Sequence, residues 1–249
     1  MIEFEKISNI KFSNKDSWAS KIFLSFDIDW AHDLIVEDTI NLIFGVSKDI
    51  KATWFITHQS KILEKLRKNK NFELGIHPNF NNLLLNKSST NIDQSTILRE
   101  IINIVPEAKS VRSHSMMQSS RLLDLFKKYG LRYDVNHFIP NFVEANLKPF
   151  KHWNGICKVP YCWEDDIHIA YQDENIIEMS PSEIANDKNI FNLKVFDFHP
   201  IHIFLNTESL KRYEESRSLH DNPKELIKYR YKGYGTRDRF LDLINLIAK

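Results

Sequence analysis

Apolar and polar positions along the chain follow two rhythms, one typical of strands and the other of helices. Short runs rich in β-branched and aromatic residues, such as Lys51-Ala-Thr-Trp-Phe-Ile-Thr57, are typical of buried strands. Between these runs, apolar residues recur three and four positions apart, which places them on one face of a helix. This succession of strand and helix predicts a parallel sheet with crossover helices. The pattern predicts a lead-in over residues 1–20, a loop over 79–89, strands over 22–27, 51–57, 72–77, 110–114, 131–135, 156–160 and 195–199, and helices over 33–44, 60–68, 90–104, 119–129, 224–231 and 238–248.

The first of these strands ends in two carboxylates. The segment Lys21-Ile-Phe-Leu-Ser-Phe-Asp-Ile-Asp-Trp30 is apolar up to Phe26 and then carries Asp27 and Asp29. Residues two apart in a strand point to the same face, so the two carboxylates are expected side by side. They repel unless a cation or a shared proton relieves them. Because parallel α/β folds place their chemistry at the C-terminal edge of the strands, the pattern indicates a site there. Two solvated acids are the alternative.

Length and composition favour one soluble α/β domain over residues 1–249. Hydrophobic residues make up 42% and charged residues 27%, which is typical of a globular protein. The 34 basic and 33 acidic side chains leave a formal net charge of +1. This balance argues against a nucleic-acid partner held by bulk positive charge.

The chain has neither the pattern of a signal peptide at Met1-Ile-Glu-Phe-Glu-Lys6 nor an apolar run of the roughly 18 residues that a membrane span needs. Two cysteines, Cys157 and Cys162, are too few for a disulfide framework. We therefore expect free thiols and a cytoplasmic location, with no membrane span.

Polar, reactive side chains follow successive predicted strands, and their order is informative. The set consists of Asp27 and Asp29, His77, Arg112 and His114, Trp163-Glu-Asp-Asp166, and His199. It resembles the polysaccharide deacetylase family (NodB homology, carbohydrate esterase 4), and most closely the WbmS-like branch associated with surface-polysaccharide synthesis. The resemblance covers residues 22–205 and rests on Phe23-Leu-Ser-Phe-Asp-Ile-Asp29, Ala52-Thr-Trp-Phe-Ile56, Glu73-Leu-Gly-Ile-His77 and Phe198-His-Pro200. It implies a distorted (β/α) barrel with the site at the C-terminal strand ends.

The resemblance also implies roles for the matching residues. Asp27 corresponds to the general base, and His199 to the acid that protonates the leaving group. Asp29 and His77 correspond to ligands of one divalent metal ion, zinc in the first place, with cobalt, nickel or manganese as alternatives. Arg112 corresponds to the residue that orients the base. This chemistry is coherent, because a divalent metal lowers the pKa of its water and a nearby carboxylate takes the proton.

Two motifs depart from the family pattern. Relatives have a second histidine four residues after the first, whereas this chain has Asn81 four residues after His77. An amide oxygen is a weaker zinc ligand than an imidazole, and from its placement we infer that His114 is the alternative ligand. The third motif reads Arg112-Ser-His-Ser115 and lacks the proline and tyrosine of relatives. The backbone N–H at Ser115 remains as a candidate oxyanion donor.

The fourth motif supplies an aromatic wall in relatives. Here Trp163 is the candidate for stacking on a sugar face or an acetyl methyl group. Asp165 or Asp166 is the candidate partner of Arg112, with Asp166 taken as the catalytic-site residue, and a solvated acidic turn is the alternative.

The leading hypothesis is a metal-dependent hydrolase that removes an N-acetyl (or O-acetyl) group from a sugar precursor in surface-glycan biosynthesis. The substrate is expected to be an acetylated sugar linked to a nucleotide or a lipid. The alternatives are a catalytically degenerate carbohydrate-binding protein of the same fold, and a related C–N hydrolase acting on a non-sugar amide. Because Asp27, Asp29, His77 and His199 are all present, the enzyme is favoured. The sequence leaves the oligomeric state open.

Overall fold

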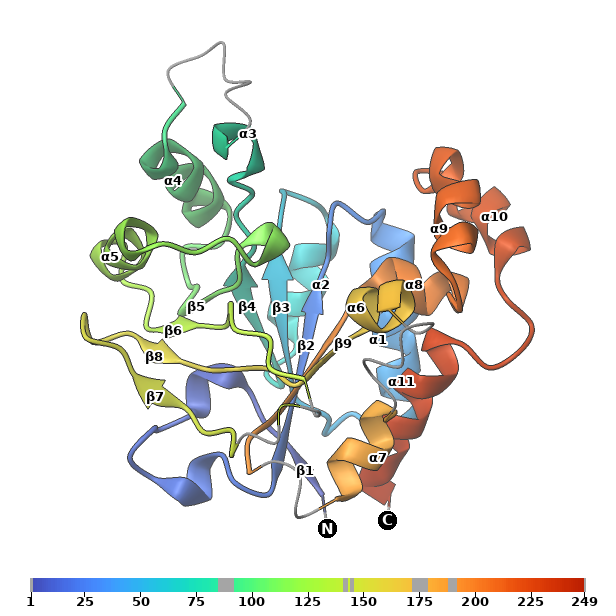
Figure 1. Cartoon of the computed structure of the whole chain (residues 1–249). Coiled ribbons are helices and arrows are strands. Elements are labelled where there is room, and N and C mark those ends of the chain that lie inside the picture. Colours follow the sequence, from blue (N-terminus) through green and yellow to red (C-terminus); the bar gives the residue numbers. More distant parts are fainter. Residues whose placement is uncertain are drawn as a thin grey trace.

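A curled, mostly parallel sheet with helices outside it makes up the computed structural model (Figure 1). The structure describes residues 2–84, 92–140, 143, 146–171, 179–187 and 192–248. Its strands are β1 (Glu3–Phe4), β2 (Lys21–Asp27), β3 (Ala52–Ile56), β4 (Phe72–Ile76), β5 (Ser110–Val111), β6 (Tyr133–Asp134), β7 (Phe150–Lys151), β8 (Cys157–Lys158), β9 (Trp163–Glu164) and β10 (Lys194–Phe198). Its α-helices are α1 (Asp33–Val46), α2 (Ile62–Lys68), α3 (Asn81–Leu84), α4 (Gln94–Ile104), α5 (Ser120–Lys128), α6 (Asp165–Tyr171), α7 (Pro181–Asn186), α8 (Pro200–Leu205), α9 (Leu210–Ser216), α10 (Pro223–Leu226) and α11 (Thr236–Ile244). Short 3-10 turns are η1 (Ile7–Asn9), η2 (Lys15–Ser17), η3 (His114–Met116), η6 (Arg217–Leu219), η7 (Ile227–Tyr229) and η8 (Asn245–Ala248).

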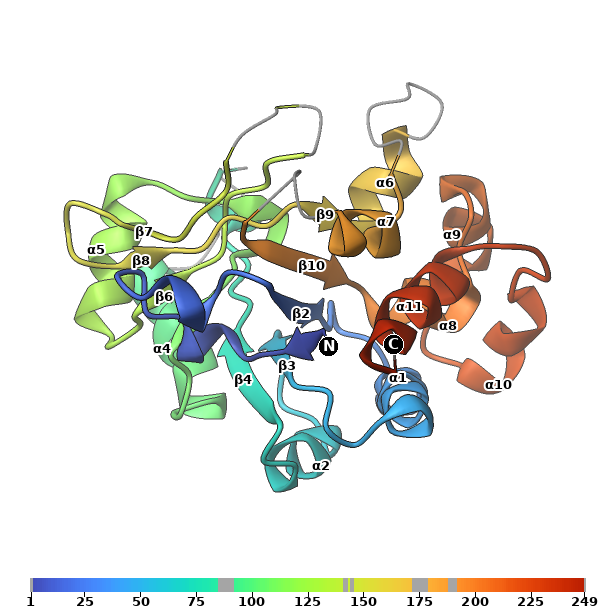
Figure 2. The same ribbon diagram turned by 90° about the horizontal axis from the view of Figure 1, so that it is seen from below.

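The strand order gives the sheet the form of a distorted barrel. The order of neighbouring strands is β7-β8-β6-β5-β4-β3-β2-β10-β9, and β1 pairs with the N-terminal part of β2. All these pairs are parallel except β7 with β8. A parallel bridge between Phe138 and Tyr161 joins the chain after β6 to the chain before β9. The sheet thus curls back toward its other edge, with α1, α2 and α4 outside it (Figure 2). The predicted distorted (β/α) barrel is confirmed.

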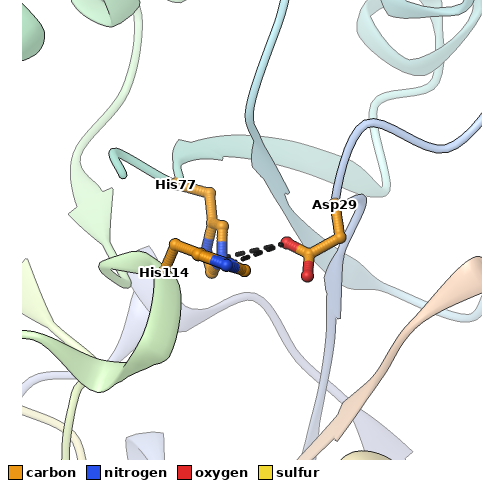
Figure 3. Close-up of side chains that lie close together, drawn as sticks. All are labelled: Asp29, His77 and His114. Atoms are coloured by element: carbon orange, nitrogen blue, oxygen red, sulfur yellow. Dashed lines mark hydrogen bonds and ion pairs between the residues drawn. The ribbon is translucent and has the colours of Figure 1, made fainter. Parts of the chain in front are cut away.

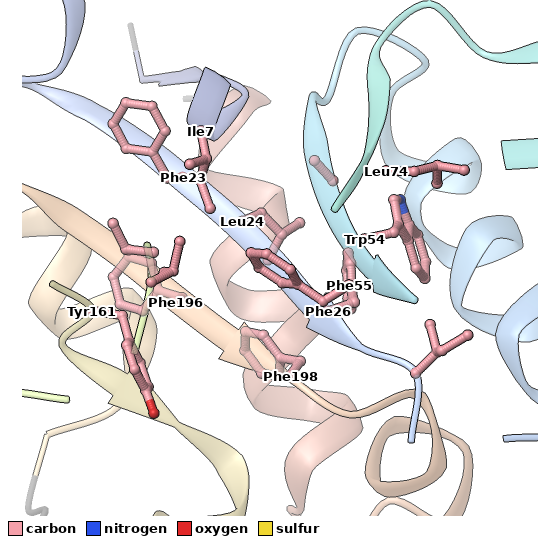
Figure 4. Close-up of a cluster of buried hydrophobic side chains, with 14 of the residues drawn as sticks. Ile7, Phe23, Leu24, Phe26, Trp54, Phe55, Leu74, Tyr161, Phe196 and Phe198 are labelled. Atoms are coloured by element: carbon pink, nitrogen blue, oxygen red, sulfur yellow. The ribbon is translucent and has the colours of Figure 1, made fainter. Parts of the chain in front are cut away.

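Strand β2 lies at the centre of the sheet and of the core. Its neighbours β3 and β10 pair with both of its edges. The side chains from Ile22 to Asp27 are buried on both faces, which matches the continuous apolar run of the sequence. Phe26 stacks on Trp54 of β3 with ring centroids 4.1 Å apart, and it meets Phe240 of α11 edge-on at 5.7 Å. Figure 4 shows this cluster of aromatic and aliphatic side chains on both sides of β2. This packing fixes the end of β2, from which Asp27 emerges.

Helix boundaries follow the capping residues. Helix α1 begins after His32, whose Nδ1 accepts a hydrogen bond from the N–H of Leu34, and α5 begins after Ser119, which caps Leu122 in the same way. Helices α1, α8 and α11 pack against one another beside β2 and β10. Within the described ranges, no helix combines the length and the apolar character needed to cross a membrane.

The main predicted strands and helices are present, and the differences concern short or polar segments. The predicted lead-in contains β1, and the predicted loop over 79–89 contains α3. Residues 85–89 of that loop lie outside the described ranges. Three predicted strands are shorter than expected and correspond to the two-residue β5, β6 and β8. Residues 163–166 are not a solvated turn, because β9 joins β10 and α6 starts directly after it. The acidic residues of this segment made the strand end look exposed. Whether an acid is buried depends on partners that are distant in sequence, and periodicity does not identify them.

Both cysteines are free, as expected, and both are buried. Burial raises the pKa of the Cys157 thiol to about 11 and that of Cys162 to about 12. The thiolate is the reactive form of cysteine, so these side chains serve packing rather than chemistry.

Gly75 is expected to be intolerant of a side chain. A Cβ at this position would lie 2.6 Å from Ser110 Oγ and 2.7 Å from the Phe55 ring. We therefore expect Gly75→Ala to lower the free energy of unfolding by about 1–3 kcal/mol, the usual cost of overpacking. Gly45→Ala is the matched control, because nothing lies within 4 Å of its Cβ position in α1 and alanine favours a helix. Chemical denaturation of both variants measures the difference, and equal stability would contradict the packing.

Candidate metal and catalytic site

Polar side chains from the C-terminal ends of several strands meet at one small cavity. Its volume is about 90 Å³. The lining residues come mainly from the ends of β2, β4, β5, β9 and β10: Asp27, Asp29, His77, Arg112, Ser113, His114, Ser115, Met116, Tyr161, Glu164, Asp166 and His199. Most ligand pockets are larger than about 300 Å³, so this cavity suits a small group rather than a whole sugar ring.

Three side chains in this cavity have the arrangement of a metal site (Figure 3). Asp29 Oδ1 lies 3.2 Å from His77 Nε2 and 3.3 Å from His114 Nδ1, and the two ring nitrogens are 3.3 Å apart. Two ligands of a tetrahedral zinc ion, each bonded at about 2.0–2.1 Å, are themselves separated by about 3.3 Å. Asp29 Oδ1 is also buried without an aligned hydrogen bond. The three donors therefore fit a divalent cation.

The electrostatics of this cluster support the same assignment. Burial opposes ionisation of Asp29, but its contacts with His114 and His77 outweigh that effect and hold the pKa of this carboxyl well below its usual range. The contact with Asp29 raises the pKa of His114 in turn. On its other side, His77 Nδ1 faces Asp27 Oδ2 at 3.4 Å. A carboxylate in that place is typical of a metal-bound histidine, because it fixes the tautomer and the ring orientation.

Asp27 is held by a buried arginine. Arg112 Nη1 donates to Asp27 Oδ1 at 2.9 Å and also to Asp197, while its Nη2 donates to Ser25 Oγ at 2.9 Å. The Nε group donates to the carbonyl of Val135 at 3.1 Å. Only 1% of Arg112 is exposed, so the guanidinium is fixed from every side. It thereby fixes the Asp27 carboxylate, and the second oxygen of this carboxylate faces His77 in the cavity.

Aromatic rings and charge keep this arginine cationic. Its guanidinium carbon lies 4.6 Å from the centroids of both Phe55 and Tyr161, which sandwich it. Burial alone would lower the pKa of Arg112, but the carboxylates of Asp197 and Asp27 outweigh burial and raise it. Burial raises the pKa of Asp197 well above its usual range.

His199 also lines the cavity and is held by a carboxylate of its own. Its Nδ1 lies 2.7 Å from Asp165 Oδ1, and its backbone N–H donates to Asp165 Oδ2 at 2.8 Å. Its Nε2 points toward Asp29 Oδ2 at 3.7 Å and Asp166 Oδ2 at 3.8 Å. Burial opposes the charge on this imidazole, yet Asp166 and Asp165 outweigh burial and raise its pKa well above the usual value. The ring is thus held as a proton donor facing the cavity.

The structure corrects two predicted partnerships in the fourth motif. Asp166 does not pair with Arg112: its Oδ1 lies 2.5 Å from His202 Nε2, because the start of α6 turns it away from the arginine. Trp163 has no exposed face for a sugar, since it is fully buried and packs on Phe198 and His168.

Asn81 and Ser115 contact each other beside the site. Asn81 Nδ2 donates to Ser115 Oγ at 3.0 Å, whereas His114 is the residue that joins Asp29 and His77. Ser115 lines the cavity in a left-handed conformation with a φ of 57°. The structure therefore brings the inferred alternative ligand, His114, into the cluster.

Three acids make contacts that the sequence did not predict: Asp165, a candidate partner of Arg112, contacts His199 instead, Glu164 accepts a hydrogen bond from Tyr161, and Asp197 accepts one from Arg112. A signal existed for Asp197, which alternates with His199 along β10 and so shares its face. Burial raises the pKa of Glu164 to about 7, and Tyr161 donates a hydrogen bond to it at 2.7 Å. Nothing in the local sequence distinguishes Asp165 or Glu164 from an acidic surface turn.

Comparison with known proteins identifies the family of the chain. The model of the WbmS-like polysaccharide deacetylase family matches residues 24–217. A crystal structure from Bordetella bronchiseptica, described as a proposed polysaccharide deacetylase involved in O-antigen biosynthesis, is 41% identical with a TM-score of 0.88, and the match covers 97% of each chain. No curated protein matches the chain.

Two further solved structures are much less similar. A 4-alpha-glucanotransferase from Thermococcus litoralis is 11% identical with a TM-score of 0.42, over 79% of this chain and 36% of that one. A carbohydrate esterase family 4 pseudoenzyme from Bacillus anthracis is 12% identical with a TM-score of 0.36, over 86% and 62%. The family match and the Bordetella structure are decisive: this chain belongs to the WbmS-like polysaccharide deacetylase family.

Proposed function

We propose that this protein is a metal-dependent hydrolase that removes an acetyl group, N-linked in the first place and O-linked as the alternative, from a sugar. The observation that carries the proposal is the arrangement around one cavity, which brings together a three-ligand cluster, a carboxylate held by an arginine and an imidazole held by a carboxylate. A general base, a general acid and a Lewis-acid site are the components that metal-dependent hydrolysis of an amide or ester uses.

Asp29, His77 and His114 would hold the metal ion, with zinc as the first candidate and cobalt, nickel or manganese as alternatives. When bound, such an ion polarises the carbonyl and makes the attacking water more acidic. Two imidazoles and one carboxylate are a familiar catalytic zinc set, which leaves a further position open.

Asp27 takes the proton of the attacking water in this proposal. One of its oxygens is fixed by Arg112 at 2.9 Å, and the other faces the cavity beside His77. Water attack on the acetyl carbonyl carbon forms one C–O bond and places negative charge on the carbonyl oxygen. The backbone N–H of Ser115, which lines the same cavity, is the proposed donor to that oxygen.

His199 gives its proton to the leaving nitrogen or oxygen of the sugar as the bond to the acetyl carbon breaks. Asp165 holds the ring with Nε2 toward the cavity, so this histidine acts at a fixed position. Acetate and the free amine or hydroxyl are the products. Asp27 on one side and His199 on the other thus carry the proton in and out of the reaction.

The substrate class follows from the size of the cavity and from the Bordetella relative. A cavity of about 90 Å³ accepts an acetyl group while the sugar stays at its mouth. The relative is described as involved in O-antigen biosynthesis. We therefore propose a nucleotide- or lipid-linked acetylated sugar precursor of a surface glycan as the substrate, and the cytoplasm, where such precursors are made, as the location.

Metal content together with acetate release tests the proposal. The wild-type protein is expected to bind about one divalent ion per chain and to release acetate from acetylated sugars when loaded. Asp29→Ala, His77→Ala and His114→Ala should each lose the metal, a larger effect than the roughly 10–100-fold weakening that outer-shell changes cause. Asn81→Ala should keep it, because the amide contacts Ser115. Elemental analysis and an acetate assay give the two readouts.

His152→Ala is the control, since this histidine lies on the turn between β7 and β8. It should retain both metal and activity. A wild-type protein that binds none of zinc, cobalt, nickel and manganese would refute the proposed metal centre and favour a binding protein of the same fold.

A further inference from the structure

An exposed tryptophan stands directly beside the metal cluster. Trp30 follows the ligand Asp29 in the chain, and 45% of its surface is exposed. Its ring meets the His114 ring edge-on, with centroids 5.2 Å apart. Because His114 lines the small cavity, Trp30 lies at the cavity rim. A large apolar ring kept in solvent next to a site is a candidate contact for a ligand.

The backbone of Trp30 is in a conformation that a bulky residue rarely adopts. Asp29 and Trp30 have φ values of 36° and 56°, and the N–H of Ala31 donates to the carbonyl of Ile28 at 2.7 Å. Positive φ at both central residues is the pattern of a type I′ turn, which favours asparagine and glycine. The N–H of Trp30 donates to Thr57 Oγ1 at 3.1 Å and holds the turn. A tryptophan in this position costs about 1–3 kcal/mol of backbone strain.

Packing does not compensate for this strain. Among the five tryptophans, Trp18, Trp54 and Trp163 are buried in the core, whereas Trp30 and Trp153 are exposed. Strained non-glycine residues also gather here, because Asp29, Trp30, Ser115 and Met116 are four of the six with positive φ among the described residues. Strain of this kind is typical of sites where function, and not stability, selects the residue.

We propose that Trp30 is the platform on which the sugar ring of the substrate stacks while its acetyl group enters the cavity. This inference rests on the proposed function and assigns its sugar-binding residue. The cavity admits a small group only, so the sugar must lie at the rim, and the buried Trp163 cannot meet it. An indole face offers a broad apolar surface to the C–H groups of a pyranose ring. Trp30 is thus a specificity residue for cyclic, sugar-like substrates.

Binding and stability together test this role. The probes are the methyl glycosides of N-acetylglucosamine and N-acetylgalactosamine, their uridine diphosphate derivatives, and chitotetraose. Their binding is followed by tryptophan emission in a Trp153→Phe background, where Trp30 is the exposed fluorophore. Trp30→Ala should weaken binding and raise KM by about ten- to thirtyfold, as loss of a tryptophan anchor typically does, and Trp30→Phe should restore part of it. The metal content should stay unchanged. Binding by Trp30→Ala, which lacks the reporting ring, is measured by calorimetry.

Trp30→Gly separates a binding role from a structural one. Glycine adopts positive φ without strain, so this variant should melt within about 2 °C of the wild type or above it, although sugar binding is lost. Trp153→Ala, with 70% of the residue exposed in the wild type, is the matched control and should change neither property.

Each remaining outcome is decisive. Turnover by the wild type with an unchanged KM in Trp30→Ala would overturn the platform and leave the hydrolase proposal standing. Trp30-dependent binding without turnover would do the reverse. A wild-type protein that binds none of the probes, or a Trp30→Gly variant that melts well below it, would overturn the platform.

Discussion

Replacing Asp27 by asparagine is expected to lower kcat for acetate release by about 10²–10⁴-fold, the contribution of a positioned general base. Asparagine cannot take a proton from water, but its amide oxygen can still accept the hydrogen bond from Arg112 that the carboxylate accepts at 2.9 Å. The three proposed metal ligands are untouched, so the protein should still bind the ion when it is supplied in excess. The measurements are kcat at saturating metal, metal content and melting temperature.

Asp197→Asn is the matched control, because it makes the same change in the same network. Asp197 is fully buried and engaged with Ser25 and Arg112, so it has no access to the attacking water. An asparagine of the same shape can still accept the hydrogen bonds from Ser25 and Arg112, so the neutral amide should be tolerated. Asp27→Asn should lose at least about tenfold more activity than this control. Similar losses in the two variants would show that the network matters only through Arg112, and would refute Asp27 as the base.

The parts of the fold that could be predicted are the strands whose side chains are all surrounded by the apolar core. The apolar run of β2 is surrounded by core on both faces, so composition alone indicates a buried strand. The ends of β2, β4 and β10 could therefore be predicted from the sequence. Asp27, His77 and His199 lie at these ends. By contrast, β5, β6 and β8 are only two residues long. Their lengths depend on curvature of the sheet, which a single-chain pattern does not encode.

The partners of the ionisable groups could not be predicted in the same way. Asp165 and Asp166 are neighbours in sequence, yet one binds His199 and the other His202. Which acid turns inward depends on where α6 starts, and that start is fixed by pairing of β9 with β10. His114 could be proposed because it lies two residues after Arg112, but only the folded η3 turn places its Nδ1 beside Asp29.

Replacing Arg112 by methionine is expected to lower the free energy of unfolding by about 3–5 kcal/mol, the usual result of removing one partner from a buried ion pair. Asp27 and Asp197 are 3% and 0% exposed, so without the guanidinium their charge has no solvent to stabilise it. Arg112→Lys keeps a charge and should be less destabilised. A single ammonium cannot reach Asp27, Asp197, Ser25 and the Val135 carbonyl together, so kcat should still fall. Denaturant unfolding of the metal-free proteins measures the stability.

Two further variants separate the charge of Arg112 from its packing. Arg121→Met removes an exposed arginine from α5 and should change stability by no more than about 0.5 kcal/mol. Adding Asp197→Asn to Arg112→Met removes one of the stranded carboxylates, so the double variant should be more stable than Arg112→Met alone. A double variant that is equally or less stable would mean that the guanidinium acts through its contacts with Phe55 and Tyr161. In that case the aromatic sandwich, and not charge balance, would be what holds Asp27 in place for catalysis.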